Sequence, residues 1–137
     1  MSGVLLDTCA VLWIGQGQGL TDVGKRRLAG ALEQNEPLFV STMSAWEIGM
    51  LAAKGRISLT RDTIDWLGQF MQATGAALAA PTPEAMVRSS ALPGELHGDP
   101  VDRILVASAR EAGLVLFTGD KSLLDYGAAG HVRVHRC

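Results

Sequence analysis

Five acidic side chains stand where an apolar run of the sequence meets a segment of helical character: Asp7, Glu47, Asp99, Asp102 and Asp120. Carboxylate oxygens are ligands for Mg²⁺, which proteins often bind through a few carboxylates together with the phosphate of a substrate. If the fold brings these acids together, they could therefore form a site for a divalent cation.

Each acid also has a simpler explanation, the capping of a helix N-terminus. Ser44 and Glu47 have the spacing of a capping box. Asp99, placed directly before Pro100, would make a good N-cap. Asp102 would then lie in the first turn, where a negative charge suits the helix dipole. The other two acids could cap the helices that follow them, so capping explains each position separately.

The two explanations differ in energy. A helix cap contributes about 1 kcal/mol to stability. Two carboxylates about 4 Å apart repel each other by about 4 kcal/mol at an effective dielectric constant of about 20. Capping cannot offset that repulsion if several of the acids meet, whereas a divalent cation can. The sequence has no cluster of His and Cys with the spacing of a zinc site.

The elements that must position these acids alternate between short apolar runs and amphipathic segments. Strands are predicted at 3–7, 37–41, 76–80, 114–118 and 131–135, and helices at 8–14, 20–34, 44–55, 60–75, 82–91, 100–112 and from 120 onward. Within the second of these helices, Val23, Leu28 and Leu32 are expected to face the core. Apolar strands separated by helices are typical of a parallel sheet covered on both faces.

The expected fold class is therefore α/β, a three-layer α/β/α sandwich with a mostly parallel central sheet of four or five strands. In such a sheet the carboxyl ends of the strands share one edge, where ligands bind. The helix N-termini point to the same edge. Acids that lie far apart in the sequence are thus predicted to converge on one cleft.

Composition limits the class of protein further. The 137 residues fit one domain over 1–137, and 47% of them are hydrophobic. A net charge of −2 gives no overall footprint for nucleic acid, so such a partner would need a local basic surface. Cys9, expected to be buried, and Cys137 do not make a disulfide framework. Neither a signal peptide nor a good membrane span is found, so a cytoplasmic location is expected.

Three segments carry a resemblance to a known family: LLDTCAVLW, VSTMSAWEIGMLAAKGRISL and LHGDPVDRILVASAREAGLVLFTGDKSLLDYG. In the order and spacing of their acids they resemble PIN-domain proteins, and in particular the VapC toxins of bacterial toxin–antitoxin pairs. The resemblance implies a PIN-like fold and an endoribonuclease that hydrolyses RNA with Mg²⁺ or Mn²⁺ as cofactor. It also implies inhibition by a cognate VapB-type antitoxin and a homodimeric state.

The same resemblance implies roles for individual residues. The catalytic acids, in family order, would be Asp7, Glu47, Asp102 and Asp120. The metal ligands among them would be Asp7, Asp102 and Asp120. Asp99 matches the first aspartate of a DPxDR variant of the third motif, and it ranks below Asp102 as a ligand. Thr8 and Thr118 match hydroxyl positions beside the acids, where they could hold carboxylates or bound water.

Basic side chains near these motifs are candidates for binding the RNA phosphates: Arg103, Lys121, Lys54 and Arg56. A solvated surface charge is the alternative for each of them. His97, which precedes Asp99, could touch the substrate, although a lone loop histidine is more often simply polar.

Other functions fit parts of the pattern. A dehalogenase-type phosphatase needs a second acid two residues after the first, and this chain has Cys9 there. A receiver domain needs an acid pair after its first strand, where Asp7 is followed by Thr8. Two alternatives stay open: a non-catalytic α/β binding module whose acids are all helix caps, and another Mg²⁺-dependent phosphohydrolase.

Overall fold

A five-stranded parallel sheet forms the centre of the protein. The computed structural model describes residues 3–137. The strands are β1 (Val4–Leu6), β2 (Leu38–Ser41), β3 (Ala77–Ala79), β4 (Val115–Thr118) and β5 (Val134–Arg136), in the order β3-β2-β1-β4-β5. Every neighbouring pair is parallel. The predicted sheet is confirmed, although its last strand lies at Val134–Arg136 rather than 131–135.

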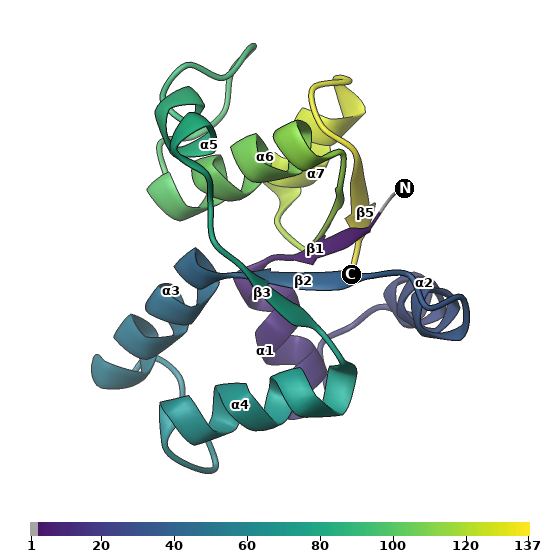
Figure 1. Ribbon diagram of the computed structural model, residues 1–137, viewed down its shortest axis with the longest axis vertical. Coiled ribbons are helices and arrows are strands. Elements are labelled where there is room, and N and C mark those ends of the chain that lie inside the picture. Colours follow the sequence, from purple (N-terminus) through teal and green to yellow (C-terminus); the bar gives the residue numbers. More distant parts are fainter. Residues whose placement is uncertain (1–2) are drawn as a thin grey trace.

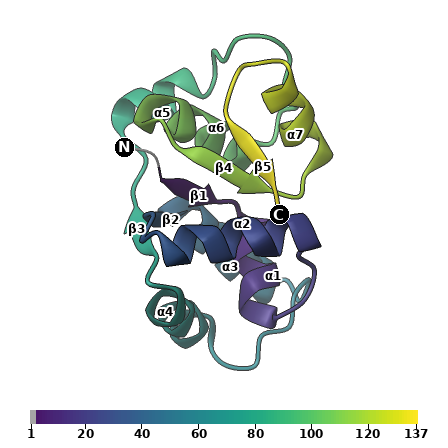
Figure 2. The same cartoon turned by 90° about the vertical axis from the view of Figure 1, so that its right-hand side faces the viewer.

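Helices cover both faces of the sheet. They are α1 (Thr8–Gln16), α2 (Asp22–Glu33), α3 (Thr42–Ala53), α4 (Thr63–Thr74), α5 (Pro83–Arg88), α6 (Pro100–Ala112) and α7 (Lys121–Ala128). Figure 1 shows α5, α6 and α7 on one side of the sheet, with α1, α3 and α4 on the other. Figure 2 shows α2 on the same side as α1. The expected three-layer sandwich is thus confirmed. None of the helices described in residues 3–137 has the length and apolar character needed to cross a membrane.

The alternation of side chains along the strands divides the core in two. Val4 and Leu6 of β1 pack into a cluster with residues of α1, α2, α3 and α4. Leu5, between them, packs into a second cluster with residues of α6 and α7. Side chains of a strand point alternately to the two faces, so a short run such as VLL serves both layers. This two-sided burial explains why the strands are apolar throughout.

Helix α2 differs from the prediction in the face that it buries. Val23 is 46% exposed and Leu32 is 51% exposed, whereas Gly24 and Ala31 are buried. Leu28 does pack against the core, as expected. The reason for the rotated face is a close backbone contact, because a Cβ at Gly24 would lie 2.5 Å from the carbonyl oxygen of Cys137. Gly24 therefore faces the chain after β5, and Val23 and Leu32 are left exposed.

The order of the strands creates a switch point in the sheet. From β1 the chain goes outward to β2 and β3, and then returns to β4 and β5 on the other side of β1. The switch in direction lies between β1 and β4, and ligands bind at such switch points, beyond the carboxyl ends of the strands. Asp7 and Asp120 follow β1 and β4 at this edge.

We expect the two leucines Leu116 and Leu32 to respond very differently to replacement by alanine. Leu116→Ala removes a fully buried side chain of β4 and should lower the free energy of unfolding by about 2–5 kcal/mol. Leu32→Ala removes a half-exposed side chain and should change it by no more than about 0.5 kcal/mol. Urea denaturation measures both. A loss at Leu32 as large as that at Leu116 would contradict the rotated face of α2.

Candidate metal centre

Asp7 is the most deeply buried acid of the site, with 3% of its surface exposed. It caps α1, and its Oδ1 accepts a hydrogen bond of 2.7 Å from the backbone N–H of Ala10. Its Oδ2 accepts a hydrogen bond from the hydroxyl of Thr118. The pKa of Asp7 is raised to about 6, mainly by burial. The hydrogen bonds from Thr118 and Ala10 oppose this rise, and the negative charges of Asp120 and Glu47 add to it.

Asp120 lies across the switch point from Asp7, at the N-terminus of α7. Its Oδ1 caps the helix by accepting from the backbone N–H of Leu123 at 3.1 Å. Its own backbone N–H donates to Thr118 Oγ1 at 3.0 Å. The Thr118 hydroxyl therefore links the two acids, because it donates to the side chain of Asp7 and accepts from the backbone of Asp120. Thr118 therefore lies beside the acids, as predicted.

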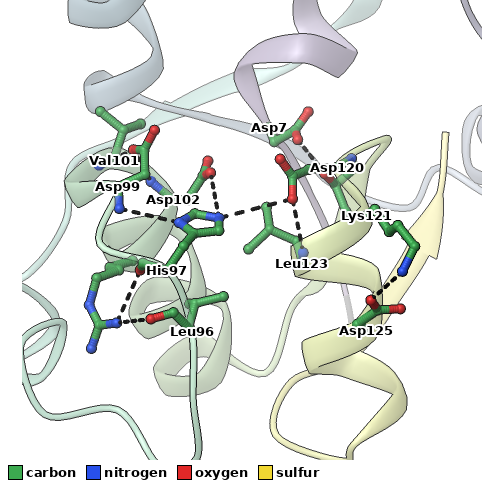
Figure 3. A network of polar contacts seen from close by, with 12 residues as sticks. Asp7, Leu96, His97, Asp99, Val101, Asp102, Asp120, Lys121, Leu123 and Asp125 are labelled. Atoms are coloured by element: carbon green, nitrogen blue, oxygen red, sulfur yellow. Dashed lines mark hydrogen bonds and ion pairs between the residues drawn. The ribbon is translucent and has the colours of Figure 1, made fainter.

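The two acids around Pro100 have different surroundings. Asp99 caps α6, and its Oδ1 accepts from the backbone N–H groups of Val101 and Asp102 at 3.0 and 3.2 Å. Asp102 lies in the first turn of α6, and its side chain points toward Asp120 (Figure 3). Burial raises the pKa of Asp102 to about 7, with further contributions from neighbouring negative charges, Asp99 first among them.

Glu47 lies on α3, but it does not form the capping box predicted from its spacing. Helix α3 begins at Thr42, and its N-cap is Ser41, whose Oγ accepts from the backbone N–H of Met43 at 3.1 Å. Ser44 is buried inside the helix, and its Oγ accepts from the Thr8 hydroxyl at 3.0 Å. The charge of Glu47 contributes to the raised pKa of both Asp7 and Asp102, so its half-buried carboxylate lies within electrostatic reach of both.

His97 lies beside two of these acids and is a further potential ligand. Its role was left undecided by the sequence. One ligand atom from each of His97, Asp102 and Asp120 lies within 4.8 Å of the others. The Nε2 atom of His97 is 3.3 Å from Asp102 Oδ2 and 4.0 Å from Asp120 Oδ1 (Figure 3). The signal in the sequence was the run HGDPVD, which places the imidazole two residues before Asp99, the cap that starts α6.

The four basic residues proposed to bind phosphate differ from one another in their contacts and exposure. Arg103 points into the loop before α6, where its guanidinium donates to the carbonyl oxygens of Ser89, Leu96 and His97. Lys121 pairs with Asp125 at 2.8 Å and is almost fully exposed. The other two candidates, Lys54 and Arg56, are exposed and follow the C-terminal end of α3. RNA binding by these four residues stays a prediction.

Cys9 is exposed, although the sequence predicted that it would be buried. It lies in the first turn of α1 and is not among the residues that this helix buries. Desolvation raises the pKa of its thiol to about 11, with contributions from the charges of Asp7 and Asp120. Cys9 therefore remains a neutral thiol at neutral pH.

The donor set fits a hard divalent cation. It consists mainly of carboxylate oxygens, which suit Mg²⁺ and Mn²⁺. Within residues 3–137, no lysine or arginine forms an ion pair with Asp7, Asp102 or Asp120. The negative charge gathered at this edge therefore has no fixed cationic partner among the described side chains. A bound cation would supply the missing positive charge.

A family model for the PIN domain matches residues 4–129. The chain belongs to the PIN domain family. This PIN domain is 34% identical to Ribonuclease VapC22 of Mycobacterium tuberculosis over 124 residues, 90% of this chain and 91% of that protein. Among solved structures it is similar to DNA-bound VapBC from Salmonella typhimurium, with a TM-score of 0.68, 17% identity, and coverage of 99% of this chain and 98% of that chain. For VapBC2 from Rickettsia felis, bound to a promoter DNA fragment, the TM-score is 0.73 at 13% identity, with the same coverage.

We expect the metal-free protein to lose stability as the pH rises through the range in which these acids ionise. Asp7 and Asp102 have folded-state pKa values of about 6 and 7, against 3.8 as the ordinary value. Between about pH 4 and about pH 7 the folded state therefore holds protons that the unfolded state has released, so rising pH favours unfolding.

The substitution Asp102→Asn removes one of these ionising groups. Compared with the wild type in EDTA, the variant should become progressively more stable from about pH 4 to about pH 7. Urea denaturation at a series of pH values measures the difference in free energy of unfolding. A difference that does not change with pH would show that Asp102 ionises in the folded state as it does in the unfolded chain.

Proposed function

We propose that this PIN domain is a metal-dependent endoribonuclease, acting as the toxin of a toxin–antitoxin pair. The observation that carries the proposal is the gathering of acids at the switch point. Asp102 and Asp120 form one group of potential ligands with His97. Burial and neighbouring negative charges raise the pKa of both Asp7 and Asp102. The sequence likeness to a protein named Ribonuclease VapC22 supports RNA as the substrate.

In this proposal Asp7, Asp102 and Asp120 hold a Mg²⁺ or Mn²⁺ ion. When bound, such an ion lowers the pKa of a water molecule and neutralises the charge that develops on a phosphodiester. The protein's part is to fix the ligands. The Thr118 hydroxyl and the Ala10 N–H hold the two oxygens of Asp7 in one orientation. The cap of α7 holds the carboxylate of Asp120 in the same way.

Glu47 is the fourth catalytic acid in this proposal. It belongs to α3, which lies on the opposite side of the sheet from α6 and α7 (Figure 1). The Thr8 hydroxyl bonds to Ser44 on the same helix, and so ties the start of α1 to α3. That contact links the segment that carries Asp7 to the helix that carries Glu47. Thr8 thus has a structural part in positioning these two acids.

Four basic side chains, Arg103, Lys121, Lys54 and Arg56, remain proposed contacts for the RNA phosphates. Lys121 directly follows Asp120 and is exposed, so it is the one best placed to reach a phosphate near the acids. Arg103 is engaged with three carbonyl oxygens of the preceding loop. Any contribution of Arg103 to RNA binding would therefore depend on how it shapes that loop.

The proposed partners are a VapB-type antitoxin and a second copy of the chain. Solved structures of similar fold are VapBC complexes, which supports an antitoxin partner. We further propose that residues 1–137 act as one PIN-like domain in the cytoplasm.

A non-catalytic binding module is the second candidate, because three of the acids do cap helices. Asp7, Asp99 and Asp120 accept hydrogen bonds from backbone N–H groups at the starts of α1, α6 and α7. Asparagine caps a helix about as well as aspartate but lacks the charge that binds a cation. Replacement by asparagine therefore separates the two functions.

Cleavage of RNA should stop in Asp7→Asn and Asp120→Asn, although both variants should fold. The matched control is Asp65→Asn, which changes an exposed acid in the first turn of α4, away from α6 and α7. This control should cleave as the wild type does. A fluorescent mixed-sequence RNA with Mg²⁺ or Mn²⁺ reports the activity, and EDTA should abolish it. Undiminished cleavage by Asp7→Asn would contradict a metal site that includes Asp7. No cleavage by the wild type with either ion would support the binding module instead.

A further inference from the structure

The imidazole of His97 lies at the front of the acidic group, on the loop between α5 and α6. Its Nε2 atom is 3.3 Å from Asp102 Oδ2 and 4.0 Å from Asp120 Oδ1. Figure 3 shows the ring between the start of α6 and the start of α7, turned toward both acids. A nitrogen in this position can act in two ways, either as a ligand that binds the cation or as a donor that holds a carboxylate.

The second ring nitrogen distinguishes these two roles. Nδ1 of His97 accepts a hydrogen bond of 3.2 Å from the backbone N–H of Asp99. An accepting nitrogen carries a lone pair, so in the neutral imidazole the ring proton is on Nε2. An Nε2 atom that carries the proton has no lone pair for a metal. It can, however, present its hydrogen to the carboxylate of Asp102, whose Oδ2 lies 3.3 Å away as a close polar contact.

The backbone that carries His97 is held by the helix that carries Asp102. Arg103 Nη1 donates to the carbonyl oxygens of Leu96 and His97, at 2.9 and 3.2 Å. Its Nε donates to Ser89 O at 2.8 Å. Because Arg103 directly follows Asp102, the first turn of α6 fixes both the acid and the loop from which the imidazole reaches it. The distance between His97 and Asp102 is thus set by local structure.

We propose that His97 is a positioning residue of the metal centre, which holds Asp102 Oδ2 through its Nε2–H and leaves Oδ1 for the cation. Asp102 needs such a donor, because its carboxylate caps no helix, whereas those of Asp7 and Asp120 are fixed by backbone N–H groups. Hydrogen bonds of this kind to a ligating carboxylate typically change metal affinity by about 10–100-fold. The inference rests on the proposed metal-dependent function.

Three substitutions of His97 test the donor role. Glutamine places an amide N–H at the same number of bonds from Cβ as Nε2, whereas asparagine reaches only as far as Nδ1. His97→Ala and His97→Asn should bind Mn²⁺ about 10–100-fold more weakly than the wild type. His97→Gln should recover most of that loss. The electron paramagnetic resonance signal of free Mn²⁺, followed during titration of each purified protein, gives the affinities.

A second measurement separates a donor from a ligand. Electron spin-echo modulation of bound Mn²⁺ detects a directly coordinated imidazole nitrogen, and the wild type should show none. A coordinated imidazole signal that disappears in His97→Gln would overturn the proposal, because His97 would then be a ligand. Equal affinities in all four proteins, or a glutamine variant as weak as the alanine variant, would overturn it as well.

These results also distinguish this inference from the function on which it rests. If the wild-type protein itself does not bind Mn²⁺, both the metal-dependent function and the role of His97 are overturned. If the wild type binds Mn²⁺ and His97→Ala binds it equally well, only the role of His97 is overturned. Melting curves recorded in EDTA should show all variants folded, since the side chain of His97 lies on a loop and is not part of either core cluster.

Discussion

Mutual repulsion among carboxylates at one edge of the sheet is the constraint on which the rest of this structure depends. Burial and neighbouring negative charge raise the pKa of Asp7 and of Asp102. Like charges in such surroundings destabilise a fold unless a positive charge offsets them. No described lysine or arginine pairs with these acids. The core clusters on the two faces of the sheet must therefore hold the acids together against this repulsion.

The helix caps have a double function in this arrangement. Asp7 and Asp120 each satisfy a backbone N–H at a helix start, and the same bond fixes the direction of the carboxylate. Sites that need well-oriented ligands benefit from such fixed side chains. In the sequence alone, capping and metal binding looked like alternative explanations for these acids. The structure shows that the two explanations are compatible. Asp102 is different, because its orientation depends on the loop that carries His97.

The fold could be predicted from the sequence because its signals are local. The apolar runs around Leu5 and Leu116 predict buried strands, and Asp99 followed by Pro100 predicts the start of α6. The features that escaped prediction depend on contacts between distant segments. The buried face of α2 is decided by the approach of Cys137 to Gly24. The contact of His97 with the acids requires the loop conformation that Arg103 holds, which spacing alone does not reveal.

The position of a bound cation is the most direct test of a metal centre at this edge of the sheet. Crystals of the wild-type protein grown with Mn²⁺ would locate the ion by its anomalous scattering. We expect one or more peaks about 2 Å from carboxylate oxygens of Asp7, Asp102 and Asp120. Mn²⁺ bound only at other acids of the surface, or no bound Mn²⁺ at all, would contradict a metal centre built from these three residues.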